Sequence, residues 1–205
     1  MSGSLALIDY GAGNLRSVEN ALRTAGATAV AVTADPETVR KADRIVLPGV
    51  GAFGHCRDQL AAIPGMIEAL DERVQRGGIP FLGICVGMQL MAARGEEHGV
   101  HQGLGWIAGT VREIPAGPSI RIPHMGWNDV VPTPGAPLVE PGEAYYLHSY
   151  HFVADNAADV LATSSHGGQI VAAVGRGNMI GVQFHPEKSQ AYGLALLARF
   201  LEWKP

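Results

Sequence analysis

The stretch "PFLGICVGMQL", residues 80–90, runs from apolar residues into a cysteine that stands between two glycines. Gly83-Ile84-Cys85-Val86-Gly87 has the form G-x-C-x-G, the cysteine version of a nucleophile elbow, in which a strand turns sharply into a helix. The residue at the apex of this turn has a positive φ, and glycines two positions away on either side avoid collisions. The segment therefore predicts a strand at 80–84, a helix at 86–94 and a thiol lifted to the surface between them. The alternative is a buried cysteine that acts as a small apolar residue.

The first half of the sequence alternates short apolar runs with amphipathic patterns. These patterns predict strands at 5–8, 29–33 and 44–47, and helices at 15–25 and 64–76. Such alternation indicates a parallel sheet that is covered by helices on both faces. Ligands of these sheets bind beyond the carboxyl ends of the strands. The loop Pro48-Gly49-Val50-Gly51 and Cys85 both follow predicted strands, so we expect them to face one crevice.

The second half has a different pattern, with alternating stretches separated by Gly-Pro, Gly-Gly and Gly-Asn turns. Antiparallel strands are predicted at 110–114, 144–153, 169–174 and 179–184, and a last helix carries Tyr192, Leu196, Leu197 and Phe200. We find no repeat and no linker, and therefore expect a single domain over residues 1–205. The predicted fold class is α/β: a three-layer sandwich with a mostly parallel central sheet, a flavodoxin-like core and added antiparallel strands.

The composition is that of an ordinary globular protein, with 205 residues, 47% hydrophobic residues and a net charge of −4. Scattered basic residues are not typical of a protein that binds nucleic acid or a membrane surface. No segment approaches the roughly twenty apolar residues that span a bilayer, and the N-terminus lacks the pattern of a signal peptide. Cys56 and Cys85, without an export signal, indicate a reducing compartment. We therefore expect a cytoplasmic protein in which Cys56 is inert.

A cysteine nucleophile needs a base, and the base needs a group that orients it. Of the eight histidines, only His185 has an acid placed by local geometry, because Glu187 lies two residues further along an extended segment. Pro186 fixes its own φ and biases His185 towards an extended conformation, which would hold the imidazole and the carboxylate side by side. The alternative is a surface turn that follows a strand.

The segment LGICVGMQL, followed a hundred residues later by GVQFHPE, resembles the class I (triad) glutamine amidotransferases, and the resemblance covers essentially the whole chain. It implies that Cys85 attacks the side-chain amide of L-glutamine and that His185 protonates the departing ammonia. It also implies that Glu187 orients His185 and that water releases glutamate from the thioester. No cofactor and no metal are implied.

The resemblance also extends to the substrate site. It implies that the backbone amides of Gly49, Val50, Gly51 and Val86 stabilise the oxyanion. The residues that it implies for glutamine binding are Gly51, Gln89, Glu97, His148, Ser149 and Tyr150. By spacing alone, Gln89 and Glu97 would be solvated residues. Because a glutaminase without its acceptor wastes glutamine, we expect the 48–51 loop to point a carbonyl into the oxyanion site until a partner is bound and loaded.

Three segments narrow the choice of partner: PHMGWN at 123–128, YLHSY at 146–150 and HPEKS at 185–189. With the opening IDYGAGNLRSV, they are similar to the family's glutaminase subunits that act in histidine biosynthesis. The resemblance implies a heterodimer with a (β/α)8 cyclase subunit, which uses the ammonia to make imidazole glycerol phosphate and aminoimidazole carboxamide ribonucleotide. The expected interface residues are Met125, Trp127, Asn128, Tyr145, Tyr146 and Lys188. A partly buried core tryptophan and a solvated lysine are the alternatives.

Three other functions are disfavoured by the sequence, and a fourth stays open. A glutaminase that feeds pyridoxal phosphate synthase is disfavoured by PHMGWN and HPEKS, and a catalytically silent subunit by the presence of all three triad residues. A zinc site is a poor interpretation because His148 and His151, three apart on a strand, face opposite ways and no CxxC lies nearby. A general cysteine hydrolase that needs no partner stays open.

Overall fold

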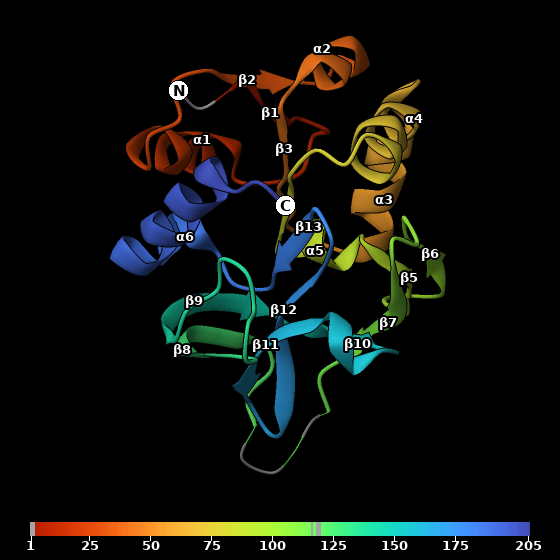
Figure 1. Cartoon of the computed structure of the whole chain (residues 1–205). Helices are drawn as coiled ribbons and strands as arrows, with labels where there is room; N and C mark the ends of the chain where they lie inside the picture. The colour runs from red at the N-terminus through yellow and green to blue at the C-terminus, as the bar shows by residue number, and fades with distance from the viewer. Residues whose placement is uncertain (1–2, 116, 118–119) are drawn as a thin grey trace.

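The structure is a computed structural model that describes residues 3–115, 117 and 120–205 (Figure 1). Within these residues, the larger sheet has nine strands in the order β2 (Val30–Thr33), β1 (Leu5–Ile8), β3 (Arg44–Leu47), β4 (Phe81–Ile84), β13 (Met179–Val182), β12 (Gln169–Arg176), β11 (Val160–Ser165), β8 (His124–Pro132) and β9 (Gly142–His148). Strands β2 to β13 in this order pair in parallel, and the remaining pairs are antiparallel. A smaller sheet has the order β10 (Tyr150–Ala154), β7 (Ile107–Glu113), β5 (Ala92–Gly95) and β6 (His101–Gln102).

Helices cover both faces of the parallel part. Figure 1 shows α1 (Leu15–Thr24) and α6 (Gln190–Glu202) on one side, and α3 (Phe53–Ala61) and α4 (Met66–Leu70) on the other. The remaining helical segments are α2 (Pro36–Lys41), η1 (Asp71–Arg76), α5 (Val86–Gln89), η2 (Ala157–Asp159) and η3 (Pro186–Lys188). The predicted α/β sandwich with a parallel centre and added antiparallel strands is confirmed. In the part of the chain that the structure describes, no helix has the length and apolar character needed to cross a membrane.

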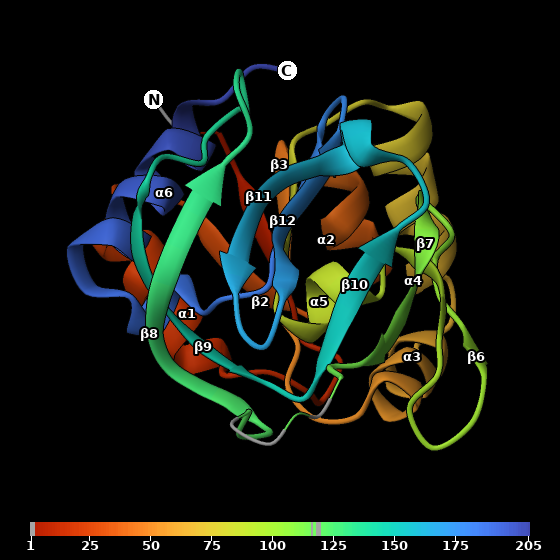
Figure 2. The same cartoon turned by 90° about the horizontal axis from the view of Figure 1, so that it is seen from below.

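Several predicted boundaries were wrong. The helix expected at 86–94 ends at Gln89, because residues 92–95 form β5 between β6 and β7. The helix expected at 64–76 is α4 followed by the π-helical η1. The strand expected at 144–153 breaks at Ser149 into β9 and β10, which belong to different sheets and lie apart in Figure 2. In the first and third cases, pairing with another strand overrides the local pattern, whereas the second segment stays helical.

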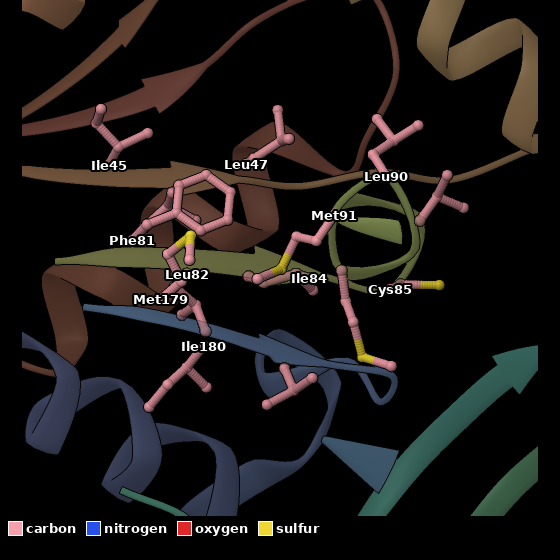
Figure 3. Packing of buried hydrophobic residues seen from close by; sticks show 14 of the residues in the cluster. Ile45, Leu47, Phe81, Leu82, Ile84, Cys85, Leu90, Met91, Met179 and Ile180 are labelled. Atoms are coloured by element: carbon pink, nitrogen blue, oxygen red, sulfur yellow. The ribbon is translucent and has the colours of Figure 1, made fainter. Parts of the chain in front are cut away.

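The central strands are apolar apart from Arg44 at the start of β3, because both faces are covered. Every residue of β1, β3, β4 and β13 is buried. Figure 3 shows side chains of β3, β4, β13 and α5 packed together, with Cys85 at the carboxyl end of β4 and its sulfur pointing away from this cluster. The core therefore fixes the base of the elbow and leaves the thiol at its rim.

The elbow at Cys85 has the strained geometry that the sequence predicted. Cys85 has φ 54° and ψ −112°, outside the regions that ordinary residues prefer. A Cβ at Gly87 would collide with the carbonyl oxygen of Leu47, and one at Gly83 would press on the carbonyl of Gly87. Glycine is needed at both positions because backbone meets backbone there. At Gly87 the start of α5 meets the end of β3, and at Gly83 strand β4 meets the start of α5.

Replacing Gly87 by alanine should therefore destabilise the fold. We expect Gly87→Ala to lower the free energy of unfolding by about 1–3 kcal/mol, because the new methyl group meets a backbone carbonyl that cannot move aside. Urea denaturation followed by circular dichroism measures this change. Gly54→Ala is the matched control, since the atoms nearest to its Cβ would be those of the ring of the partly exposed His101 and not backbone atoms. Equal losses in the two variants would contradict this account of the elbow.

Candidate active site

The parallel pairing of β4 with β13 brings together two segments that lie a hundred residues apart. Ile84 is in register with Val182, and the Cys85 N–H donates to the carbonyl of Val182 at 2.8 Å. His185 lies just beyond the end of β13. Its N–H donates to the Tyr145 carbonyl at 2.9 Å, and its own carbonyl accepts from Ser189 Oγ at 2.7 Å. Cys85 and His185 thus stand at neighbouring strand ends, on backbone that is held in place.

His185 and Glu187 form a buried pair. Their Nδ1 and Oε1 atoms are 2.9 Å apart, and the side chains are only 3% and 1% exposed. The backbone of His185 is extended, with φ −103° and ψ 98°, as expected for a residue before proline. Burial alone would lower the pKa of His185, but hydrogen bonds with Cys85 and Glu187 outweigh it and raise the pKa to about 10. The raised pKa means that the imidazole keeps its proton at neutral pH.

Cys85 and His185 line one cavity of about 320 Å³. A cavity of this size is at the small end of the range for ligand sites and suits a small molecule. Val50, Val86 and Lys188 also line it, whereas Gly49 does not. Around it stand all the residues that the sequence suggested for substrate binding: Gly51, Gln89, Glu97, His148, Ser149 and Tyr150.

Gln89 and Glu97 have structural contacts that the sequence did not predict. The Gln89 side-chain amide is buried and donates to the Tyr150 carbonyl and to Gln183 Oε1, both at 3.0 Å. A Glu97 carboxylate oxygen accepts from the Phe53 N–H at 2.7 Å, at the start of α3, where the helix dipole favours a negative charge. No local signal could have revealed these bonds, since the partners lie far away along the chain. Both residues help to build the cavity wall.

The loop at 48–51 carries a carbonyl where an oxyanion hole requires amides. The Gly49 carbonyl oxygen accepts a hydrogen bond from the Val86 N–H at 3.3 Å. This amide, at the start of α5 and next to the thiol, is one of the expected oxyanion donors. The Gly49 carbonyl thus points at the start of α5. That residues 49–51 and Val86 form an oxyanion site stays a prediction.

An exposed apolar face lies on the hairpin of β8 and β9, beside the cavity. Met125 and Trp127 are 65% and 46% exposed, and they pair in register with Leu147 and Tyr145. The ammonium of the exposed Lys188 lies 5.9 Å from the centre of the Tyr145 ring. Leu147 and Val131 are also exposed on this hairpin, which was not predicted. The two-residue alternation that starts at Met125 and Trp127 would have predicted an exposed Val131.

Two residues expected on this face point the other way. Tyr146 is fully buried, so the expectation of Tyr146 at an interface was wrong. Neighbouring residues of a strand face opposite sides, and Tyr145 and Tyr146 therefore cannot share one surface. Asn128 is half-buried, and its amide donates to the Ser165 carbonyl at 2.9 Å and contacts His124 Nε2 at 3.0 Å.

Asn128 belongs to a chain of hydrogen bonds that ends at the cavity. His148 Nδ1 lies 2.9 Å from the Tyr150 carbonyl, which can only accept, so Nδ1 carries the proton. His148 Nε2 then accepts from His124 Nδ1 at 2.9 Å, and His124 Nε2 accepts from Asn128. Both histidines must be neutral in this arrangement. Burial does keep them so, because it lowers the pKa of His124 to about 4 and that of His148 to about 3.

Comparisons with known proteins agree with this geometry. The family "Glutamine amidotransferase class-I" matches residues 6–203. The chain is 59% identical to imidazole glycerol phosphate synthase subunit HisH of Zymomonas mobilis subsp. mobilis, covering 100% of this chain and 98% of that protein. It is 53% identical to the subunit of the same name of Brucella suis biovar 1, covering 98% and 99%.

Solved structures share the fold at much lower identity. One described as a glutamine amidotransferase superposes with a TM-score of 0.75 at 20% identity, covering 96% of this chain and 97% of that one. A chain in the structure of PurLQS from Thermotoga maritima gives a TM-score of 0.75 at 18% identity, with 98% of each chain covered.

The two neutral histidines should make stability fall in mild acid. Their folded pKa values lie below the ordinary value of 6.5, so the unfolded chain takes up protons that the folded chain does not as the pH falls from about 6.5 towards 4. The raised pKa of His185 affects the free energy of unfolding only above about pH 6.5, outside this pH range.

Between pH 7 and pH 5, the free energy of unfolding of the wild type should fall more than that of His124→Asn. We expect the two losses, measured by urea denaturation at both pH values, to differ by about 1–2 kcal/mol. Asparagine keeps a donor near the place of Nδ1. The exposed His55→Asn serves as the control and should behave as the wild type does. The same pH dependence in both variants would refute the neutral assignment of His124.

Proposed function

Since the chain belongs to the class-I glutamine amidotransferases, we propose that Cys85, His185 and Glu187 form the triad that hydrolyses L-glutamine to glutamate and ammonia. The observation that carries this proposal is the buried His185–Glu187 pair, 2.9 Å between Nδ1 and Oε1, which lines the same cavity as Cys85 through His185. We also propose that residues 1–205 form one catalytic domain, which the family match over 6–203 supports.

The chemistry follows from the charges of the three groups. In the proposed mechanism Cys85 reacts as a thiolate, and the protonated His185 beside it serves as the acid. The thiolate attacks the side-chain carbonyl carbon of glutamine, and the carbonyl electrons move to oxygen. His185 gives its Nε2 proton to the departing nitrogen, so ammonia leaves and a thioester remains. Water then attacks the thioester while His185 takes up a proton, and glutamate leaves with the thiolate restored. Glu187 holds Nδ1 throughout.

The chain is the glutaminase subunit of an imidazole glycerol phosphate synthase, which acts in histidine biosynthesis; the curated relatives carry this name at 59% and 53% identity over nearly the full length of both chains. Its product ammonia needs an acceptor. We propose that a (β/α)8 cyclase subunit receives it and makes imidazole glycerol phosphate and aminoimidazole carboxamide ribonucleotide. A cytoplasmic location is proposed as well, in keeping with the two free cysteines.

The proposed docking surface combines Met125, Trp127 and the half-buried Tyr145 of the hairpin with the exposed Lys188 of η3. It lies next to the cavity, since Leu147 and Lys188 belong to both the cavity wall and the exposed surface. Aromatic and methionine side chains of this exposure are typical interface anchors. A partner on this face would lie over the cavity mouth, where ammonia is released.

The oxyanion loop supplies a reason for the partner to control turnover. The Gly49 carbonyl occupies the Val86 amide that the negatively charged intermediate would need. We propose that rotation of the Gly49–Val50 peptide, which turns the Val50 N–H towards the site, accompanies binding of the loaded cyclase. Glutamine hydrolysis then occurs only when the ammonia has a use.

The catalytic assignment predicts that Cys85→Ala abolishes glutamine hydrolysis by the assembled complex. We expect glutamate release to fall at least about a thousandfold, as is usual when a nucleophile is removed. Product formation with added ammonium salt in place of glutamine should stay within about twofold, because the cyclase chemistry is on the other subunit. Glutamate release at the wild-type rate by Cys85→Ala would rule out the proposed triad.

The docking surface predicts a role for Trp127 in activation. Titration of the wild-type chain with the loaded cyclase subunit should raise its glutamine hydrolysis at least about tenfold, and Trp127→Ala should need about ten times more cyclase for half of this effect. Val100→Ala, another exposed apolar residue, is the control and should titrate as the wild type does. Turnover that is the same with and without cyclase would contradict the loop switch, and an unchanged titration of Trp127→Ala would contradict the surface.

A further inference from the structure

Two buried side chains hold the oxyanion loop from the side opposite to the substrate. The Tyr10 hydroxyl donates to the Pro48 carbonyl at 2.7 Å, and the Cys56 thiol donates to the Val50 carbonyl at 3.3 Å. Tyr10 is 3% exposed and Cys56 is fully buried. Neither lines the cavity, so neither can touch the substrate. The carbonyl between them, that of Gly49, is the one bonded to the Val86 amide.

These bonds fix the peptide planes on both sides of the one that has to rotate. A single peptide plane turns over when ψ of the residue before it and φ of the residue after it change in opposite senses. The planes of Pro48–Gly49 and Val50–Gly51 then keep their places, and so do the carbonyls that Tyr10 and Cys56 hold. The Gly49–Val50 plane is left free to turn.

The surroundings of this middle plane allow rotation but little displacement. A Cβ at Gly49 would press on the Gly87 nitrogen, the Tyr10 hydroxyl and the Val86 side chain, so the chain is closely confined there. The Val50 side chain, in contrast, is 40% exposed and is not held by the core. The loop can therefore turn one peptide but cannot shift as a whole without breaking the two outer bonds.

We propose that Tyr10 and Cys56 are positioning residues that restrict the oxyanion loop to two states, carbonyl-in and amide-in, by holding the peptides on either side of Gly49–Val50. This proposal rests on the proposed glutaminase function and assigns a role to the second cysteine, which the mechanism does not use. Without the two bonds, the rotated amide would lack a fixed direction, and its help to the negatively charged intermediate would fall.

The state of both donors is consistent with this role. Burial raises the pKa of Cys56 to about 11, so the thiol keeps its proton at neutral pH and can donate. Burial, together with the nearby Cys56, raises the pKa of Tyr10 as well, and its hydroxyl also stays protonated. Cys56 is thus a hydrogen-bond donor and not a second nucleophile.

The test is steady-state glutamine hydrolysis by the chain assembled with its cyclase subunit and the cyclase ligand. Tyr10→Phe and Cys56→Ala should each lower kcat at least threefold, within the roughly two- to tenfold range of one hydrogen bond, with KM within twofold. Cys56→Ser, which is nearly as small as alanine but keeps a donor, should retain most of the wild-type kcat. Circular dichroism melting curves show whether each variant is folded.

The outcomes separate this proposal from the glutaminase function on which it rests. If the wild-type complex does not hydrolyse glutamine, the proposed function itself fails. If the wild type is active and both Tyr10→Phe and Cys56→Ala lose less than threefold in kcat, the positioning role is overturned. It is also overturned if folded Cys56→Ser loses as much as Cys56→Ala, or if the loss appears in KM with kcat unchanged.

Discussion

The structure depends above all on the parallel pairing of β4 with β13. These strands are neighbours in the sheet although their sequences are nearly a hundred residues apart, and the Cys85 N–H continues their ladder by donating to Val182. Because parallel strands end at the same edge, the residues that follow them meet. The thiol and the imidazole therefore meet through backbone hydrogen bonds in the core and not through a flexible loop. A site held in this way keeps its geometry at little entropic cost when glutamine binds.

Around this fixed pair the structure arranges parts with different freedom. The His185–Glu187 pair and the wall of Gln89 are buried and hydrogen-bonded, whereas Val50 of the oxyanion loop is substantially exposed. In the proposed mechanism, these rigid residues supply the nucleophile and the base, and the exposed loop couples ammonia production to its use. A single peptide would then determine whether the intermediate is stabilised.

The parts that could be predicted from the sequence are those with a local signal. The elbow follows from two glycines around Cys85, and the extended backbone of His185 follows from Pro186. The parallel strands follow from short apolar runs. What could not be predicted depends on tertiary partners. Residues 92–95 form a strand because β6 and β7 flank them, and Glu97 accepts from the Phe53 N–H in the first turn of α3. The expectation of Tyr146 at an interface was a different kind of error, because the alternation of side chains along β9 could have been read from the local sequence.

In the hairpin of β8 and β9, one pairing register decides which side chains face outwards and which face inwards. On one side it presents Met125 and Trp127 to the exterior, and on the other it turns His124 and Asn128 into the chain of hydrogen bonds that reaches Tyr150. A slip of β8 by one residue against β9 would exchange the two sides, burying the tryptophan and exposing the imidazole. The proposed docking surface and the inward side of the hairpin are therefore coupled in evolution. An insertion or deletion in this hairpin has to involve an even number of residues, or lie in the turn, to keep both sides facing as they do.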